Sequence, residues 1–271
     1  MPLNIKGTSA GGFTVKGDMA GTSATNVKNY LPSQETGVFL WLRGDLGITL
    51  AGTKVQNWAN QGTTGGTFIQ NTVASQPVYN SQALSGSAGW PSVSFTSGSH
   101  YFSVYTSNTN VINSNSNYTF FFACNPADAT SGTQLWLMDI ASLPGGSPTR
   151  LIFAQDAAAQ DKHVAYFNGS YQGTDVVHSG TIGAQVLTFE LDSAGSSIYR
   201  NTTVLTSSLP YSPVSIVTGS NGTVSFTLAA ATSGGASWFT GDIFEVIGVS
   251  NTTAGMRQRI QNYLINRYGI Y

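Results

Sequence analysis

The spacing of apolar residues along the chain predicts many short strands. Residues 38–43, 90–95 and 118–124 are either apolar throughout or alternate apolar with polar side chains, and both patterns are typical of strands. The pairs Asn168-Gly169 and Asn221-Gly222 adopt positive φ with ease and indicate tight turns between later segments. Strands at this density, without a long helical pattern between them, predict an all-β fold of two antiparallel sheets packed as a sandwich.

The C-terminal end of the chain carries a different pattern. Apolar side chains there recur at the i, i+4, i+7, i+8 spacing of one helix face: Met256, Ile260, Tyr263 and Leu264. Thr252 or Thr253 can cap the start of this helix, and Gly269 suits a left-handed stop. A strand over residues 241–250, apolar on both faces, comes just before it. The sequence therefore predicts one short C-terminal helix that closes the domain.

The first part of the chain differs in composition from the rest. Residues 7–24 are rich in Gly, Ser and Thr, and only residues 13–15 resemble a strand fragment. We expect residues 1–36 to form an extended N-terminal arm for anchoring or assembly, with a disordered tail as the alternative. Residues 37–271 are expected to form the sandwich domain.

Charged residues are unusually few. Asp, Glu, Lys and Arg make up 8% of the chain, against roughly 25% in an average soluble domain. The formal net charge is −1, and the Lys and Arg residues are scattered, so the sequence predicts neither a nucleic-acid partner nor polybasic membrane binding. A surface of uncharged polar residues is typical of extracellular adhesins, wall proteins and virion components.

The sequence shows no pattern for export or membrane insertion. The N-terminus has no basic stretch followed by an apolar core, as a signal peptide would, and no apolar run is long enough to cross a membrane. Cys124 is the single cysteine and lies in an apolar run, so we expect a buried thiol, with no intrachain disulfide and no thiolate metal cluster. A virion protein, assembled in the host cytoplasm and acting outside after lysis, reconciles this pattern with an adhesin-like surface.

Three stretches resemble the laminin-G-like, concanavalin A-like lectin/glucanase family. Residues 40–62 are similar to its opening strand and turn, residues 189–203 to its late hairpin, and residues 241–270 to its closing strand and helix. The resemblance covers about residues 38–271 and implies a jelly-roll sandwich of two curved sheets, which occurs in bacterial surface proteins and phage structural proteins. Asn60 stands where the family often has Asp, which weakens any inference of a calcium site near that loop.

Glucanases of this family use the carboxylates of a Glu-x-Asp-x-x-Glu pattern on one strand, where side chains two apart share a face. Here Glu190 and Asp192 match the first two positions, but Gly195 and Ser196 occupy the region of the third. A strand end and an Asp-initiated turn explain the two carboxylates as well. The three histidines, His100, His163 and His178, have no metal-ligand spacing. With the third carboxylate also missing, we predict a non-enzymatic protein without metal or cofactor.

Sugar binding is the activity that this resemblance suggests first. It would use aromatic platforms together with Asn and Asp hydrogen bonds, in a concave surface or at loop tips. Five aromatic residues near predicted loops or strand ends are candidates, and each also fits packing at the core or its rim: Tyr101, Tyr105, Tyr171, Tyr211 and Trp238.

A buried ion pair is predicted between the opening and closing strands. Arg43 shares a strand face with Phe39 and Trp41, and Glu245 shares one with two isoleucines. Neither charge would be buried without compensation, so we expect Arg43 and Glu245 to pair inside the sandwich. We assign this pair to stability and not to catalysis.

Composition, the arm and the resemblance together favour a non-enzymatic virion structural protein of a tailed phage, as capsid decoration or as a tail fibre or spike component. The arm would bind other virion proteins, and a homo-oligomer, such as a trimer, would contact host or environmental glycans. One alternative is a secreted or surface carbohydrate-binding module with an extracellular location. A glycoside hydrolase or lyase is the other.

Overall fold

The computed structural model divides the chain into two units, Met1–Tyr30 and Leu31–Tyr271. The predicted arm lies almost entirely outside the described residues, so its form and its boundary at residue 37 stay predictions. The described residues belong almost entirely to the second unit, and the side chains of some of their strand residues are also left undescribed. The described residues are 30–84, 89–96, 99–106, 117–127, 134–143, 150–156, 162–167, 170–173, 183–192, 194–209, 223–230 and 238–270.

Strands dominate the described part of the chain. The elements are β1 (Val38–Arg43), β2 (Ile48–Ala51), β3 (Lys54–Ala59), β4 (Thr67–Ile69), β5 (Val78–Asn80), β6 (Ser92–Phe95), β7 (Phe102–Thr106), β8 (Tyr118–Pro126), β9 (Gln134–Leu143), β10 (Arg150–Asp156), β11 (Lys162–Phe167), β12 (Ser170–Gly173), β13 (Gln185–Leu191), β14 (Ser196–Arg200), β15 (Thr203–Leu209), β16 (Thr223–Leu228), β17 (Gly241–Ser250) and α1 (Ala254–Tyr268). Short 3-10 turns cover Pro32–Gln34 and Val73–Ser75.

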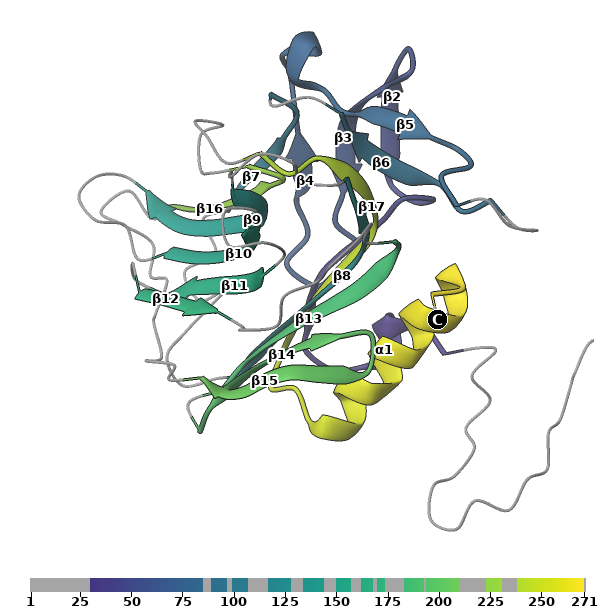
Figure 1. The fold of residues 1–271 in the computed structure, drawn as a ribbon. Helices are drawn as coiled ribbons and strands as arrows, with labels where there is room; N and C mark the ends of the chain where they lie inside the picture. Colours follow the sequence, from purple (N-terminus) through teal and green to yellow (C-terminus); the bar gives the residue numbers. More distant parts are fainter. Residues whose placement is uncertain are drawn as a thin grey trace, which may run out of the picture. The chain divides into compact units, whose positions relative to one another are not determined.

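The first sheet is antiparallel, in the order β15-β14-β13-β8-β17-β1 (Figure 1). The closing strand β17 pairs with β8 along its whole length. On its other side, its C-terminal half pairs with β1 and its N-terminal half pairs with β6. The opening and closing strands of the described unit are therefore neighbours in one sheet.

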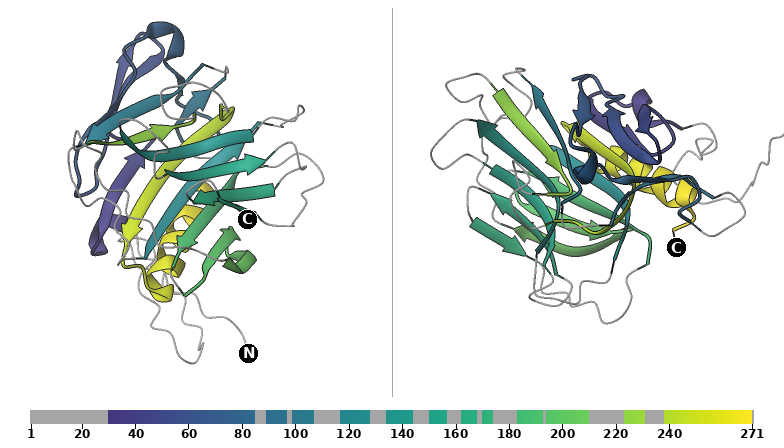
Figure 2. Two further views of the ribbon diagram at one scale, coloured as in Figure 1. Left: turned by 90° about the vertical axis from the view of Figure 1, so that its left-hand side faces the viewer. Right: turned by 90° about the horizontal axis from the view of Figure 1, so that it is seen from above.

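The second sheet is also antiparallel, in the order β12-β11-β10-β9-β16-β7-β4, and it continues through β3 to β2. Strands β5 and β6 connect β3 back to β17, so a small lobe of strands β2 to β6 joins the two sheets (Figure 2). The predicted all-β antiparallel sandwich of jelly-roll type is confirmed.

Aromatic side chains fill the space between the sheets. Phe120 and Phe122 of β8 and Phe189 of β13 meet Phe153 of β10, with ring centroids 4.7 to 5.9 Å from Phe153. Full burial of one such side chain stabilises the fold by about 1.5–3 kcal/mol. Cys124 is buried beside them, and burial raises the pKa of its thiol, as expected for an inert core cysteine.

Helix α1 lies on the outer face of the first sheet, against β13 and β8 (Figure 1). It starts at the N-cap Thr253, whose Oγ1 accepts a hydrogen bond of 3.2 Å from the amide of Met256. It ends at Gly269, in the left-handed conformation at φ 63°. Both predicted ends are confirmed, with Thr253 as the cap. Among the described residues, no helix is long and apolar enough to cross a membrane.

The free edge of β1 is covered by the loop that follows β3. Asn60 holds this loop in place: its Oδ1 accepts from the amides of Trp41 (2.7 Å) and Gly62 (2.8 Å). Its Nδ2 donates to the carbonyls of Phe39 (3.0 Å) and Gly65 (2.9 Å), and contacts Thr64 Oγ1 at 3.0 Å. A carboxylate could not donate these bonds, which gives a physical reason for Asn at this position. The loop also blocks strand addition at β1.

Candidate functional site

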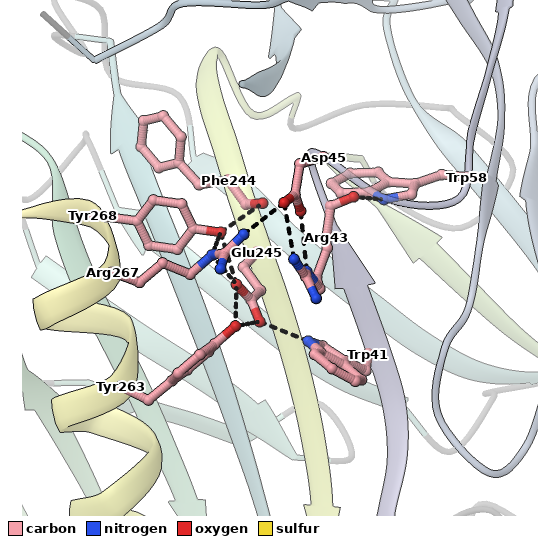
Figure 3. A network of polar contacts seen from close by, with 9 residues as sticks. All are labelled: Trp41, Arg43, Asp45, Trp58, Phe244, Glu245, Tyr263, Arg267 and Tyr268. Atoms are coloured by element: carbon pink, nitrogen blue, oxygen red, sulfur yellow. Dashed lines mark hydrogen bonds and ion pairs between the residues drawn. The ribbon is translucent and has the colours of Figure 1, made fainter. Parts of the chain in front are cut away.

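A buried polar network connects β1, β17 and α1 (Figure 3). At its centre is Glu245, whose side chain has no exposed surface. The indole Nε1 of Trp41 donates to Glu245 Oε1 at 2.6 Å. From the helix, the hydroxyls of Tyr268 and Tyr263 donate to the same carboxylate at 2.7 Å and 3.2 Å. The opening strand, the closing strand and the helix that follows it thus share one carboxylate, although Trp41 and Glu245 are 204 residues apart in the sequence.

Two arginines and Asp45 continue this network toward the surface (Figure 3). The guanidinium of Arg267 lies 3.5 Å from Glu245 Oε2 through Nε and 2.6 Å from Asp45 Oδ2 through Nη2. Arg43 binds the same Asp45 with both Nε (3.0 Å) and Nη2 (2.8 Å). Such two-pronged pairing fixes the orientation of both side chains.

The predicted pairing of Arg43 with Glu245 needs a correction. The two residues are direct partners in the register of β1 and β17, but the ion pairs are arranged differently. Arg43 forms its ion pair with Asp45, because the turn after β1 returns that carboxylate to the guanidinium. The cation paired with Glu245 is Arg267 of α1. A signal for it was present, since Arg267 follows Tyr263 by four residues and so shares its helix face.

The pKa values of the two carboxylates in the network shift in opposite directions. Burial raises the pKa of Glu245 above its ordinary value, and the hydrogen bonds from Tyr268 and Trp41 only partly offset this. For Asp45, desolvation is outweighed by the hydrogen bond from Arg43 and the charge of Arg267, which together lower its pKa. Burial also raises the pKa values of Tyr263 and Tyr268, so both hydroxyls stay protonated as donors. We assign this network to stability, because its charged and polar groups form their hydrogen bonds and ion pairs with one another.

A second group of side chains is more open to solvent. Tyr101 and Trp238 contact each other with ring centroids 5.8 Å apart at 42°. Trp238 also forms a backbone bridge with Trp136 of β9, and all three side chains are partly exposed. We call Tyr101, Trp136 and Trp238 the aromatic cluster. The local sequence pattern does not predict the place of Trp136 in this cluster, because its bridge with Trp238 joins residues that are distant in the sequence.

Backbone contacts fix the position of the aromatic cluster at one end of the second sheet. The amide of Tyr101 donates to the carbonyl of Ser75 at 3.3 Å, and Gln70 Nε2 donates to the carbonyl of Tyr101 at 3.2 Å. Next to Trp238, the amide of Phe239 donates to the carbonyl of Ala229 at 3.0 Å. The cluster is therefore held by main-chain bonds on both sides, which keeps its surface preorganised.

The structure brings together two of the five predicted sugar-binding aromatics, Tyr101 and Trp238. Tyr105 lies in β7 opposite Ser225, and Tyr171 lies in β12, but their side chains are outside the described part. Tyr211 is outside the described residues altogether. A role in sugar binding for these three stays a prediction.

The two carboxylates that match the glucanase pattern make local structural contacts. Glu190 accepts a hydrogen bond of 2.9 Å from the Tyr199 hydroxyl and pairs with Arg257 of α1 at 3.4 Å. Asp192 Oδ1 accepts from the amide of Ala194 at 2.9 Å, as in an Asp-initiated turn. Within the described residues, no three His, Cys, Asp or Glu side chains come together as metal ligands.

Comparison with known proteins supports the fold. No family model matches the sequence, and no curated protein is significantly similar to it. Among solved structures, botulinum neurotoxin type C, which depends on two ganglioside molecules to enter cells, is similar with a TM-score of 0.56 and 9% identity. The match covers 84% of this chain and 51% of that one. The binding domain of botulinum neurotoxin serotype D/C gives a TM-score of 0.55, 11% identity, and coverage of 84% and 52%.

The chain thus spans about half the length of these structures. At such low identity the likeness shows the β-sandwich fold alone. The CBM40 of a Ruminococcus gnavus IT-sialidase, bound to α2,3-sialyllactose, has a TM-score of 0.46 at 10% identity. The match covers 63% of this chain and 95% of that one. This score is too low to support a conclusion.

Proposed function

We propose that the protein is a non-enzymatic carbohydrate-binding module of the β-sandwich class, with the aromatic cluster as its sugar platform. The observation that carries the proposal is the ring contact of Tyr101 with Trp238, which forms a backbone bridge with Trp136, and the partial exposure of all three side chains. Aromatic faces suit the C–H surface of a sugar ring, and Tyr and Trp combine an apolar body with a polar tip. A fold shared with toxin binding domains supports the same reading.

The sharpest test is a glycan array followed by titration calorimetry on the best ligand. Trp238→Ala and Tyr101→Ala should each weaken binding at least tenfold, because each removes a ring from the platform. Trp238→Phe, which keeps a ring, should retain most of the affinity, and Val204→Ala, at an exposed apolar residue of β15 in the first sheet, should change nothing. Wild-type affinity in both alanine variants would reject this site.

The non-enzymatic part of the proposal has its own test. Incubation with a panel of polysaccharides should release no reducing sugar. Release that is lost in Glu190→Gln would instead establish a hydrolase or lyase at the carboxylate pair, where Glu190 now contacts Tyr199 and Arg257.

A second candidate is the virion structural protein, located in the particle and anchored through residues 1–36. One observation favours it: the charged fraction of 8%, because a surface of uncharged polar residues is typical of virion components. In this proposal the module is part of a homo-oligomer on a capsid or tail and contacts glycans there. Purified particles should contain the protein, and deletion of residues 1–30 should remove it from them. Particles that lack the protein would contradict this role.

A further inference from the structure

A row of polar residues crosses the first sheet where β17 meets β6 and β8. Asp242 of β17 is the register partner of Ser94 on one side and of Asn125 on the other. Directly opposed residues of neighbouring strands share a face of the sheet. The next residues along these strands, Val93, Cys124 and Ile243, belong to the hydrophobic core. The polar row therefore lies on the outer face of the sheet.

Within this row the carboxylate of Asp242 is held by one oxygen and leaves the other free. Oδ1 accepts hydrogen bonds from the hydroxyls of Ser92, at 2.8 Å, and Ser94. Among the described residues, neither Oδ2 of Asp242 nor the side-chain amide of Asn125 has a hydrogen-bond partner, and both side chains are partly exposed. The row therefore presents a fixed acceptor next to a group that can both donate and accept.

Trp90 borders this row on the side of the helix. Its indole ring meets Tyr268 edge to face at 5.7 Å, and the guanidinium of Arg267 lies 4.3 Å from its centroid. Tyr268 also contacts Phe244, which follows Asp242 by two residues in β17. Trp90 remains partly exposed. Two contacts from the helix thus fix an aromatic surface beside the polar row.

We propose that Ser92, Ser94, Asp242 and Asn125, together with Trp90, form a second binding site, for a neutral hydroxylated ligand such as one pyranose unit. The free oxygen of Asp242 would accept from sugar hydroxyls, the Asn125 amide would bond a neighbouring hydroxyl, and the indole of Trp90 would cover the C–H face. An unpaired carboxylate at the centre disfavours acidic sugars. This site lies on the first sheet, whereas Trp136 of the aromatic cluster lies on the second.

The site requires only these residues and not the aromatic cluster. If both sites bind, one module holds two sugars, and a polyvalent glycan surface would be bound with higher avidity than either site provides. Two sites would extend the proposed carbohydrate-binding function, but the second site depends only on its own contacts and is tested separately.

The test follows the indole N–H resonances of the full chain by NMR during titration with three methyl glycosides: glucoside, mannoside and galactoside. The Trp90 resonance is assigned with Trp90→Phe. We expect at least one neutral glycoside to shift it saturably. Asp242→Asn keeps an acceptor for the two serines and should weaken this binding at least tenfold. Asn125→Ala, which removes no contact within the described residues, should weaken it several-fold.

The outcomes separate the two proposals. Trp238→Ala should leave the titration of Trp90 unchanged, so loss of calorimetric binding in that variant, with the Trp90 shift retained, identifies two independent sites. The second site is overturned if no neutral glycoside shifts Trp90, or if Asp242→Asn and Asn125→Ala both bind like the wild type. A methyl sialoside that binds at Trp90 more tightly than every neutral sugar would overturn the assigned ligand class.

Discussion

The indole N–H of Trp41 donates a hydrogen bond of 2.6 Å to Oε1 of Glu245, across a sequence separation of 204 residues. It joins the opening strand β1 to the closing strand β17, and Tyr263, Arg267 and Tyr268 bring the helix to the same carboxylate. The motifs that resemble the lectin/glucanase family contain these residues. This contact therefore links two stretches from opposite ends of the sandwich domain.

Glu245→Gln tests the weight of this network. The amide would direct N–H groups at the donors that now meet a carboxylate, and Asp45 would remain the only carboxylate paired with Arg267 among the described residues. We expect a loss of about 2–3 kcal/mol in the free energy of unfolding at pH 7, measured by urea denaturation. Arg259→Gln is the matched control, since it breaks the ion pair between Arg259 and Glu35, in which the arginine side chain is 47% exposed. That change should cost less than about 1 kcal/mol, and equal losses in the two variants would contradict the prediction.

The pH dependence of stability should differ between the two carboxylates. Burial raises the pKa of Glu245 in the folded state above the unfolded value of about 4.3. Between these values the folded chain holds a proton that the unfolded chain has lost. The contribution of Glu245 to stability is therefore complete below about pH 4.3 and is lost as the pH rises through the folded pKa. Glu245→Gln should accordingly destabilise the protein more at pH 4 than at pH 7.

Asp45 should show the opposite sign. Arg43 and Arg267 lower its pKa in the folded state below the unfolded value of about 3.9. Its contribution is therefore present above that value and is lost as the pH falls through the folded pKa. Asp45→Asn should destabilise at pH 7 and converge with the wild type in strong acid. Unfolding free energies measured from about pH 2 to pH 8 decide this, and curves that stay parallel below about pH 3.9 would contradict it.

The N-cap of α1 gives a local test. Thr253 satisfies the amide of Met256 through its Oγ1, so Thr253→Ala should cost about 1 kcal/mol. Thr202→Ala, at an exposed turn residue with no described side-chain bond, serves as the control and should stay within about 0.5 kcal/mol of the wild type. Thermal unfolding of both variants is the measurement, and a neutral Thr253→Ala would mean that the cap bond does not form in solution.

Local patterns in the sequence predicted the strands, the helix and its ends, because the period of apolar residues and the capping chemistry act over a few residues. They also placed Arg43 and Glu245 close together. They did not predict that Arg267 pairs with Glu245, since that contact depends on how the helix is rotated on the sheet. Nor did they predict that β6 pairs with β17, because register between distant strands is set by the whole core and not by either strand. Trp136 escaped notice for the same reason: its contact with Trp238 depends on tertiary packing.

Asn60→Asp is the most specific test of the loop that covers β1. Oδ1 can still accept from the amides of Trp41 and Gly62, but the second oxygen would face the carbonyls of Phe39 and Gly65, which now accept from Nδ2. The Gly65 carbonyl loses its donor, the Phe39 carbonyl keeps only its bonds from Thr64, and both carbonyls face a negative charge. We therefore expect a loss of about 2–4 kcal/mol in the free energy of unfolding.

Asn57→Asp provides the matched control for this substitution, because Asn57 is also a partly exposed residue of this segment and makes no side-chain hydrogen bond within the described part of the chain. It should change the free energy of unfolding by less than about 0.5 kcal/mol. Hydrogen exchange should show the reason for the difference: the amides of Gln61, Thr63 and Thr64, which bond to carbonyls of β1, should lose protection in Asn60→Asp alone. Unchanged protection there, with stability equal to the wild type, would show that the loop holds β1 without the Asn60 amide.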